Sequence, residues 1–595
     1  MIYEEFENPM TPLLASVKRP GRYTGGEWGA YVRDIPDDGG IVRVCLAFPD
    51  VYEVGMSYLG YQILYSLIKT LDYADAERAY CPWLDMEREM RARGIPLSSL
   101  ESFRPLNDFD ILGFTLQYEL CATNILTMLD LGGIPLKASE RGEQIPIVIG
   151  GGGGACSPAP LEMFFDAFCI GDGEECLPEV LAVMRELNGR PRDEKLGALS
   201  RLPNVYVPGT RARRTKAAIV ENLDEGFLNR TMIVPNIGII HDRAAVQAFR
   251  GCTRGCRFCQ AGMIGRPRRE RGVGSVISQI EDLLTFTGWD EVGLLSLATC
   301  DWSGLDEFIR AFGEALELRK VKLSLPSLRM DAFSVELASR LEGMRRGGVT
   351  FAPEAGSERL RRVINKGLSN GDIDRALDAA FKHGWDRVKL YFMMGLPTET
   401  DADLDGIIDI ADKTVHYARI NKRRGEAAVS AAGFVPKPHT PFQWEPQATR
   451  EYLRDRGRYI KGRVKSKKIS LSYHEPDQTF LEGVFARGDA SLGSVVLEAW
   501  LRGARFDGWT ECFDIGRWED AFRDKCIDAE GIVSRRRGLD EPLPWDIIDV
   551  GVTKEFLARE RARAFAETPT NDCNGGMCNG CGWRNDFAGC GMGGA

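Results

Sequence analysis

Three closely spaced cysteines constrain this chain more than any other feature of its sequence. They are Cys252, Cys256 and Cys259, in the spacing C-x3-C-x2-C. Three thiolates on one short loop can bind three irons of a cubane [4Fe–4S] cluster, which leaves the fourth iron open to a small molecule. A structural zinc ion prefers four ligands, and no fourth Cys or His lies near this loop, since the nearest histidine is His241. The spacing therefore favours an iron–sulfur cluster over zinc or over incidental buried thiols.

The cysteine loop directly follows the first strand of a region in which strands and helices alternate. Strands are expected at 244–250, 291–297, 321–327, 349–354, 386–394 and 428–435. Helices are expected between them, at about 274–287, 304–318, 333–343, 357–363, 371–383 and 401–420. Six such units predict a partial (β/α)6 barrel of the TIM type, with its chemistry at the carboxyl ends of the strands.

The residues before this barrel predict a separate doubly wound α/β domain. Strands are expected at 41–48, 111–116, 145–150 and within 165–174, with helices at about 59–71, at about 123–131 and up to about 187. Such a flavodoxin- or Rossmann-like sheet binds ligands beyond the carboxyl ends of its parallel strands. We therefore expect an N-terminal domain at 1–215, a linker at 216–241, the barrel at 242–450 and a less regular C-terminal extension at 451–595.

Composition narrows the cellular setting and the partners. The 595 residues carry a net charge of −10, which argues against a dominant nucleic-acid surface but does not exclude RNA as a partner. No signal peptide and no apolar run of membrane-spanning length is found, so we expect no membrane contact. Sixteen cysteines without a secretory signal fit a reducing compartment. The expected location is the cytoplasm.

The cysteine triplet, with Phe258 directly before its last cysteine, resembles the radical S-adenosylmethionine (SAM) superfamily. In that family the open iron binds the amino and carboxylate groups of SAM. The reduced cluster then cleaves SAM to methionine and a 5′-deoxyadenosyl radical. The resemblance implies SAM as a cofactor and a reductant such as flavodoxin or ferredoxin as a partner.

The same resemblance assigns SAM contacts to the loops that follow later barrel strands. Ser296 takes the place of a contact to the SAM amino group, and Glu354 and Ser357 suit the ribose or the amino-carboxylate end. Gly395 and Pro397 form a turn that brings the backbone near the adenine. Each of these loops is otherwise an ordinary strand-to-helix connection that uses Gly and Pro.

The N-terminal domain resembles the cobalamin-binding domain that precedes many radical SAM enzymes. That domain usually carries D-x-H-x-x-G, whose histidine binds cobalt from below, but this chain has tyrosine in place of the histidine. Neutral imidazole is a good metal ligand, whereas a phenol with a pKa near 10 is a poor one. Either cobalamin binds without a lower protein ligand, or the domain keeps the fold and has lost the cofactor. The candidate corrinoid-binding residues are Asp50, Tyr52, Gly55, Thr115, Gly150 and Gly151.

Four further cysteines lie in a Gly- and Asn-rich tail, Cys573, Cys578, Cys581 and Cys590. Four thiolates can hold one zinc ion or an auxiliary iron–sulfur cluster. Tetrahedral sulfur suits both, so the sequence leaves the metal open. The alternative is a tail whose cysteines are incidental.

Taken together, the chain resembles fused bacterial radical SAM proteins with a cobalamin-binding-like domain and no assigned reaction. We expect reductive SAM cleavage with cobalamin-assisted methyl transfer to an unactivated carbon. One alternative is a cobalamin-independent radical SAM enzyme for sulfur insertion or RNA modification, because residues 434–442 faintly resemble methylthiotransferases. Another is a non-catalytic assembly or regulatory protein that binds metal or corrinoid. The substrate is unknown.

Overall fold

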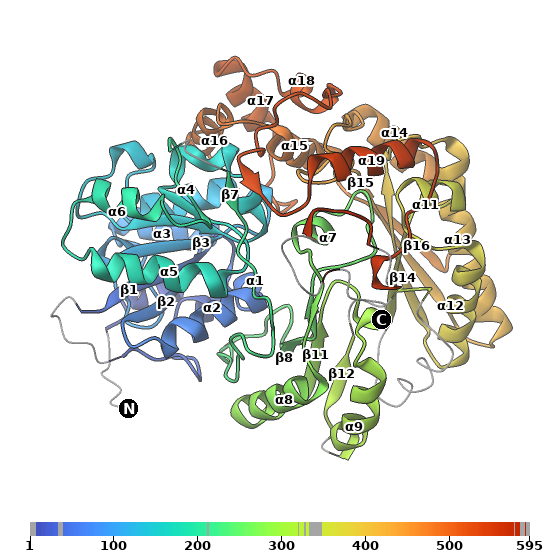
Figure 1. Ribbon diagram of the computed structural model, residues 1–595, viewed down its shortest axis with the longest axis horizontal. Coiled ribbons are helices and arrows are strands. Elements are labelled where there is room, and N and C mark those ends of the chain that lie inside the picture. The colour runs from blue at the N-terminus through green and yellow to red at the C-terminus, as the bar shows by residue number, and fades with distance from the viewer. Residues whose placement is uncertain are drawn as a thin grey trace.

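A computed structural model describes residues 7–33, 40–210, 214–318, 320–325, 329–331, 348–575, 578–583 and 590. Its N-terminal domain is built on a sheet with the strand order β2-β1-β3-β4-β5-β6, on the left of Figure 1. The first five strands are parallel and β6 is antiparallel to β5. The bounds are β1 (Val42–Phe48), β2 (Ala74–Tyr80), β3 (Ile111–Thr115), β4 (Ile147–Gly151), β5 (Ala167–Cys169) and β6 (Val205–Tyr206).

Helices cover both faces of this sheet, as the predicted doubly wound fold requires. One face packs on α2 (Leu59–Thr70) and α5 (Gly173–Glu186), and the other on α3 (Leu84–Arg93) and α4 (Ala122–Leu131). A further helix, α6 (Arg192–Leu199), contacts α5. The strand order 2-1-3-4-5 is that of flavodoxin-like folds, so the predicted fold class of this domain is confirmed.

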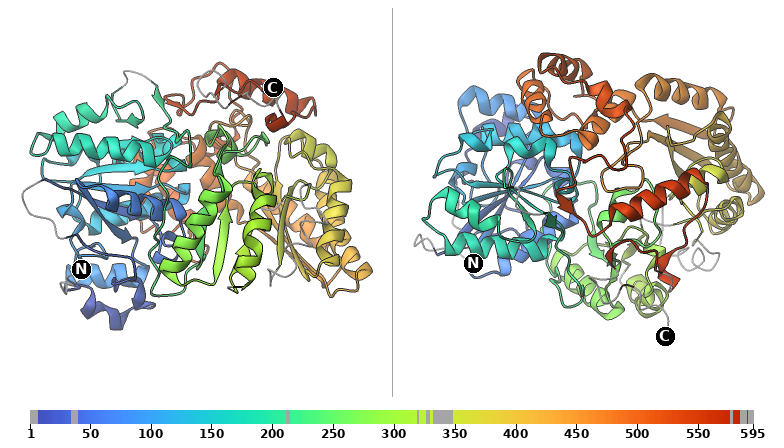
Figure 2. Two further views of the ribbon diagram at one scale, coloured as in Figure 1. Left: turned by 60° about the horizontal axis from the view of Figure 1, so that its bottom comes forward. Right: turned by 45° about the horizontal axis from the view of Figure 1, so that its top comes forward.

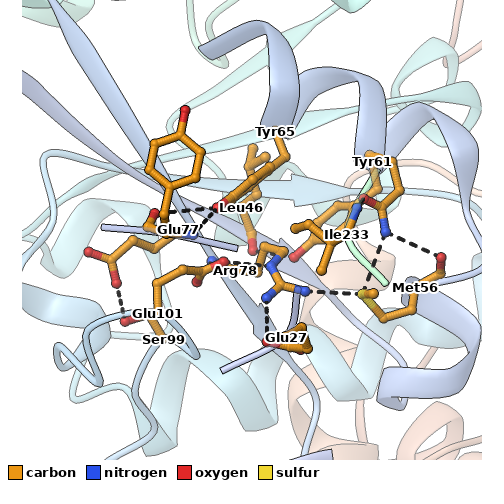
Figure 3. A network of polar contacts seen from close by, with 12 residues as sticks. Glu27, Leu46, Met56, Tyr61, Tyr65, Glu77, Arg78, Ser99, Glu101 and Ile233 are labelled. Carbon is orange, nitrogen blue, oxygen red and sulfur yellow. Dashed lines mark hydrogen bonds and ion pairs between the residues drawn. The ribbon is translucent and has the colours of Figure 1, made fainter. Parts of the chain in front are cut away.

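Strand β2 was not predicted, because its sequence ADAERAY has no apolar run. All seven of its residues are nevertheless buried. Figure 3 shows how its charges are satisfied inside the domain: the Arg78 guanidinium pairs with Glu101 at 2.5 Å and with Glu27 at 2.9 Å, while Glu77 accepts a hydrogen bond from the Ser99 hydroxyl at 2.6 Å. Buried charges are tolerated when they are paired and hydrogen bonded, so this polar segment can serve as an interior strand.

The second part of the chain contains the predicted α/β barrel strands in two parallel sheets (Figure 1). One has the order β12-β11-β8 and the other the order β13-β14-β15-β16. The strands are β8 (Ala244–Gln247), β11 (Glu291–Leu295), β12 (Lys322–Ser324), β13 (Val349–Glu354), β14 (Arg387–Met394), β15 (Glu426–Gly433) and β16 (Ile469–Tyr473). The outer helices are α8 (Val273–Thr287), α9 (Leu305–Leu318), α11 (Glu358–Val363), α12 (Asn370–Lys382), α13 (Asp401–Ile420) and α14 (Arg450–Arg463).

One detail differs from the sequence prediction. Strand β16 pairs with β15 in parallel, so the barrel sheet runs past residue 450 into the range assigned to the C-terminal extension. The helix predicted at 333–343 lies outside the described residues. A short antiparallel ribbon of β9 (Phe249–Arg250) and β10 (Arg269–Glu270) encloses the cysteine loop.

The C-terminal extension bridges the other two parts along the top of Figure 1. Helix α16 packs on α4 of the N-terminal domain, and α19 contacts α11 of the barrel. A single apolar core joins Leu116, Met263 and Trp500, one residue from each part. The extension contains α15 (Pro476–Arg487), α16 (Leu492–Leu501), α17 (Ile515–Asp524), α18 (Ala529–Ser534), α19 (Lys554–Phe565) and strand β17 (Ile548–Asp549), which pairs with β7 (Thr215–Lys216).

None of the helices in the described part of the chain has the length and apolar character that spanning a bilayer requires. A cytoplasmic location stays a prediction.

Candidate functional site

The cysteine loop lies where the sequence predicted it, between the first barrel strand and the short helix α7 (Gln260–Ile264). Cys252, Cys256 and Cys259 are all half-buried. The turn before them requires glycine: Gly251 has a φ of 80°, and a Cβ there would lie 2.5 Å from two backbone oxygens. At the other end, the Cys259 sulfur accepts a hydrogen bond from the Gly262 amide at 3.3 Å and caps α7.

The three thiols lie near one another. Burial raises the pKa of Cys252, and the neighbouring Cys256 raises it further. Burial raises the pKa of Cys259 to about 12, again with a contribution from Cys256. Iron would reverse this effect, since a coordinating thiol is deprotonated.

The donor set suits a cluster. A cubane offers a separate iron to each of three thiolates on one loop and leaves the fourth iron open. The donor set and its placement on one loop therefore fit a [4Fe–4S] cluster.

Two arginines tie the cysteine loop to the rest of the molecule. Arg254 pairs with Asp301, after β11, and its Nε lies 3.1 Å from an Asp572 carboxylate oxygen in the tail. Arg257 is fully buried and lies 3.2 Å from Glu560 of α19. Figure 2 shows α19, in red, crossing the barrel close to this loop. The loop is therefore held from the barrel side and from the C-terminal side.

Glu354, a predicted SAM contact, faces the cysteine loop through a lysine. Its carboxylate lies 3.2 Å from the Lys366 ammonium group. Burial lowers the pKa of Lys366, but Glu354 and Cys256 raise it above its ordinary value, so the lysine lies within electrostatic range of both. The sequence did not identify Lys366, because no local pattern indicates that this lysine pairs with Glu354, twelve positions earlier.

Ser296 and Ser357, also predicted SAM contacts, use their hydroxyls inside the protein. The Ser357 hydroxyl caps α11 by accepting from the Leu360 amide at 3.0 Å, and it also donates to Asp403. The Ser296 hydroxyl lies 3.0 Å from that of Thr299. Ser296 keeps its place at the end of β11, while Ser357 has a structural role as a helix cap.

Gly395 and Pro397 form the predicted turn after β14. Gly395 has a φ of 79°, and its amide donates to the Glu399 carboxylate at 2.8 Å. A Cβ at this glycine would lie 2.7 Å from that of Ala448. Burial raises the pKa of Glu399 to about 7. The Glu399 carboxylate therefore holds the turn in place.

Three successive barrel loops hold a non-glycine residue in the left-handed region. These are Glu354 at the end of β13 (φ 68°), Thr398 after β14 (φ 68°) and His439 after β15 (φ 58°). Such conformations cost free energy and cluster at functional sites. The carboxyl ends of barrel strands are also where chemistry is expected in this fold.

The candidate corrinoid residues at 50–55 are engaged in packing. Tyr52 is buried against Tyr80, with ring centroids 5.2 Å apart, and its hydroxyl accepts from the Asn236 amide at 3.3 Å. Burial raises the pKa of Tyr52 above its ordinary value. Asp50 accepts a hydrogen bond from the Trp509 indole at 3.0 Å. A Cβ on Gly55, in α1 (Tyr52–Gly55), would collide with Tyr80.

The glycine turn after β4 is also packed against neighbouring segments. A Cβ on Gly150 would lie 2.9 Å from side-chain atoms of Leu116 and Phe168, whereas one on Gly151, the residue opposite Thr115, meets nothing within 4 Å. The next segment, η6 (Gly153–Cys156), contacts α7 directly. A phenol that is buried, protonated and hydrogen bonded does not fit a ligand to cobalt, and corrinoid binding stays a prediction.

Two family models match this chain, one described as "Radical SAM proteins, N-terminal" at residues 60–208 and one as "Radical SAM superfamily" at 246–411. An uncharacterized protein of Methanocaldococcus jannaschii, MJ0966, is 26% identical over 455 residues, covering 76% of this chain and 90% of the relative. A putative methylthiotransferase of the same organism, MJ0865, is 25% identical over 170 residues, or 27% of this chain and 36% of the relative.

Two solved structures match this chain at low sequence identity. The radical SAM methyltransferase TsrM from Kitasatospora setae, with cobalamin and a [4Fe–4S] cluster bound, has a TM-score of 0.48 at 16% identity, covering 68% of this chain and 77% of that one. The cobalamin-dependent radical enzyme OxsB, with aqua-cobalamin and SAM bound, has a TM-score of 0.46 at 13% identity, covering 89% and 79%. The superfamily match at 246–411 contains the cysteine loop and the loops after β11, β13 and β14.

Proposed function

We propose that this chain, which belongs to the radical SAM superfamily, is an enzyme that holds a [4Fe–4S] cluster on Cys252, Cys256 and Cys259 and cleaves SAM reductively. The carrying observation is the position of this loop at the carboxyl end of the first barrel strand. When bound, the reduced cluster supplies the electron that splits SAM into methionine and a 5′-deoxyadenosyl radical. That electron would come from a protein such as flavodoxin or ferredoxin.

The chain's own residues would bind and orient SAM. Glu354 is the best supported of the candidate contacts, because Lys366 holds its carboxylate beside the cysteine loop. We assign Glu354 to the ribose hydroxyls, for which a carboxylate is a suitable acceptor. The Gly395–Pro397 turn would pack its backbone on the adenine, and Ser296 would accept from the SAM amino group. Helix α19 of the C-terminal extension, which contacts α11 of the barrel, would help to exclude water from this end.

The test is SAM cleavage by the reconstituted protein under dithionite. Wild type should release 5′-deoxyadenosine, measured by liquid chromatography and mass spectrometry. A variant with Cys252, Cys256 and Cys259 changed to Ala should release none. Cys526→Ala is the matched control, since Cys526 is exposed on the extension. Cleavage by the triple variant would refute the assignment.

Corrinoid-assisted methyl transfer to an unactivated carbon is the finer proposal. The strand order of the N-terminal sheet and the Asp50–Gly55 frame support it, and the TsrM structure is described as a methyltransferase with cobalamin bound. Because Tyr52 does not fit as a lower ligand, we derive no step through the corrinoid. Added hydroxocobalamin should bind without a spectrum of protein nitrogen ligation. Absence of tight binding would favour a cobalamin-independent enzyme, the class suggested by the putative methylthiotransferase.

A further inference from the structure

We propose that the tail cysteines Cys573, Cys578, Cys581 and Cys590 hold a second iron–sulfur cluster beside the first cysteine loop, with Arg266 as its counter-charge. The sequence left both the metal and the position of this centre open. The contacts of the tail indicate where the centre lies, and one buried guanidinium group indicates that the centre is anionic.

The tail runs directly against the first cysteine loop. Cys573 opens the short turn η9 (Cys573–Gly575), and its sulfur lies 3.9 Å from the Thr253 carbonyl oxygen, between two of the first three cysteines. Its neighbour Asp572 forms the ion pair with Arg254. The start of the tail is therefore fixed beside the loop proposed to hold the first cluster.

Two of the other tail cysteines, Cys581 and Cys590, approach the same place. Arg266, Cys581 and Cys590 all lie within electrostatic range of the Cys573 thiol. Cys581 is buried, and its carbonyl oxygen accepts from the Thr553 amide at 2.8 Å, just before α19. The Cys578 sulfur accepts from the Gly580 amide at 3.3 Å, the bond length that Cys259 makes with Gly262 in the first loop. Such N–H···S bonds tune the potential of iron–sulfur clusters.

Arg266 is the second, independent observation. Its side chain is buried, 3% exposed, and among the residues that the structure describes none of its three guanidinium nitrogens has a hydrogen-bond partner. The Phe556 ring lies 5.3 Å away, and a Cβ on Gly255 would lie 3.4 Å from Nη2. An unpaired buried charge is strongly unfavourable, so this group requires an anion. A thiolate-bound cluster is anionic, and Arg266 lies in range of Cys252 on one side and Cys573 on the other.

Position favours iron and sulfide over a single zinc ion. The tail lies against the loop proposed to hold the first cluster, and zinc has no redox chemistry. An iron–sulfur centre at this position could exchange electrons with the first cluster or bind substrate.

Metal content of the anaerobically purified full chain tests the proposal. Wild type should hold about eight irons, four for each cubane. Changing the four tail cysteines to Ser should halve the iron and preserve 5′-deoxyadenosine formation, whereas Cys526→Ser should change neither. The variant with Cys252, Cys256 and Cys259 changed to Ala should keep the tail cluster, so failure of the proposed function is separable from failure of this inference. Unchanged iron in the tail variant, or loss of zinc in place of iron, would overturn it.

The role of Arg266 has its own readout. In the background without the first three cysteines, Arg266→Gln should lower the reduction potential of the tail cluster, because a positive charge favours the reduced form. Arg266→Lys should restore most of the wild-type potential. Redox titration followed by electron paramagnetic resonance measures both variants. Equal potentials in the Gln variant and in the protein with Arg266 would contradict the assignment.

Discussion

The barrel and the N-terminal domain place the carboxyl ends of their parallel strands in different surroundings. At the carboxyl ends of the barrel strands stand three thiols, the Glu354–Lys366 pair and strained backbone. At the carboxyl ends of the N-terminal strands, Asp50 is hydrogen bonded to Trp509 of the C-terminal extension, and Tyr52 is buried. Ligands bind at such edges in both folds.

The difference shows that one architecture can use the same edge in two ways. In the barrel, the strained backbone and the Glu354–Lys366 pair lie where they can serve chemistry. In the N-terminal domain, the corresponding groups are satisfied by neighbouring segments, and the edge becomes an interface. Variants at the two edges should therefore separate activity from stability.

The largest expected effect concerns the interior of the N-terminal sheet. Arg78→Met should lower the free energy of unfolding by about 3–5 kcal/mol, because Glu101 and Glu27 stay buried without their cation. Urea denaturation measures it. Arg88→Met is the control, since Arg88 is exposed and its nearest carboxylate is 3.7 Å away; it should change stability by less than about 0.5 kcal/mol. A loss below about 1 kcal/mol for Arg78→Met would mean that the buried pair does not support β2.

Strand β2 also shows what the sequence can and cannot predict. Apolar runs identify strands such as β1 and β14, and the spacing of Cys252, Cys256 and Cys259 identifies the loop between β9 and α7. The burial of Arg78 depends on partners at positions 27 and 101, which no local pattern reveals. Lys366 and Arg266 were missed for the same reason, since their surroundings form only when distant loops meet.

At the barrel edge, Lys366→Met should reduce SAM cleavage by about 100-fold, or about 2.7 kcal/mol. The substitution removes the cation that holds Glu354 and lies in range of Cys256. Initial rates of 5′-deoxyadenosine formation measure the change. Lys413→Met removes a surface pair with Asp374 and should leave the rate within about two-fold. Equal rates in Lys366→Met and Lys413→Met would show that the Glu354–Lys366 pair does not contribute to SAM cleavage.

At the N-terminal edge, Asp50 should make stability depend on pH. Burial raises its pKa to about 6 from 3.8. A raised folded-state pKa stabilises the protein below the unfolded pKa, and this contribution disappears as pH rises through about 6. It amounts to at most about 3 kcal/mol. Urea denaturation between pH 4 and 7 should show the decline in wild type, and Asp50→Asn should remove that part of it. An unchanged pH slope in the variant would assign the decline to other carboxyls, such as Glu101.

The smallest effect is expected for Tyr52→Phe. This change removes only the hydroxyl oxygen, so it tests whether Tyr52 serves in packing or in metal binding. It removes the hydroxyl that accepts from the Asn236 amide, so stability should fall by about 1 kcal/mol. Tyr58→Phe is the control, because that ring is 37% exposed and its loss should be close to zero. If Tyr52 serves only to pack α1 against the sheet, any corrinoid bound by wild type should show the same visible spectrum in Tyr52→Phe. A changed spectrum would place the phenol beside cobalt and make the N-terminal edge a second site of chemistry.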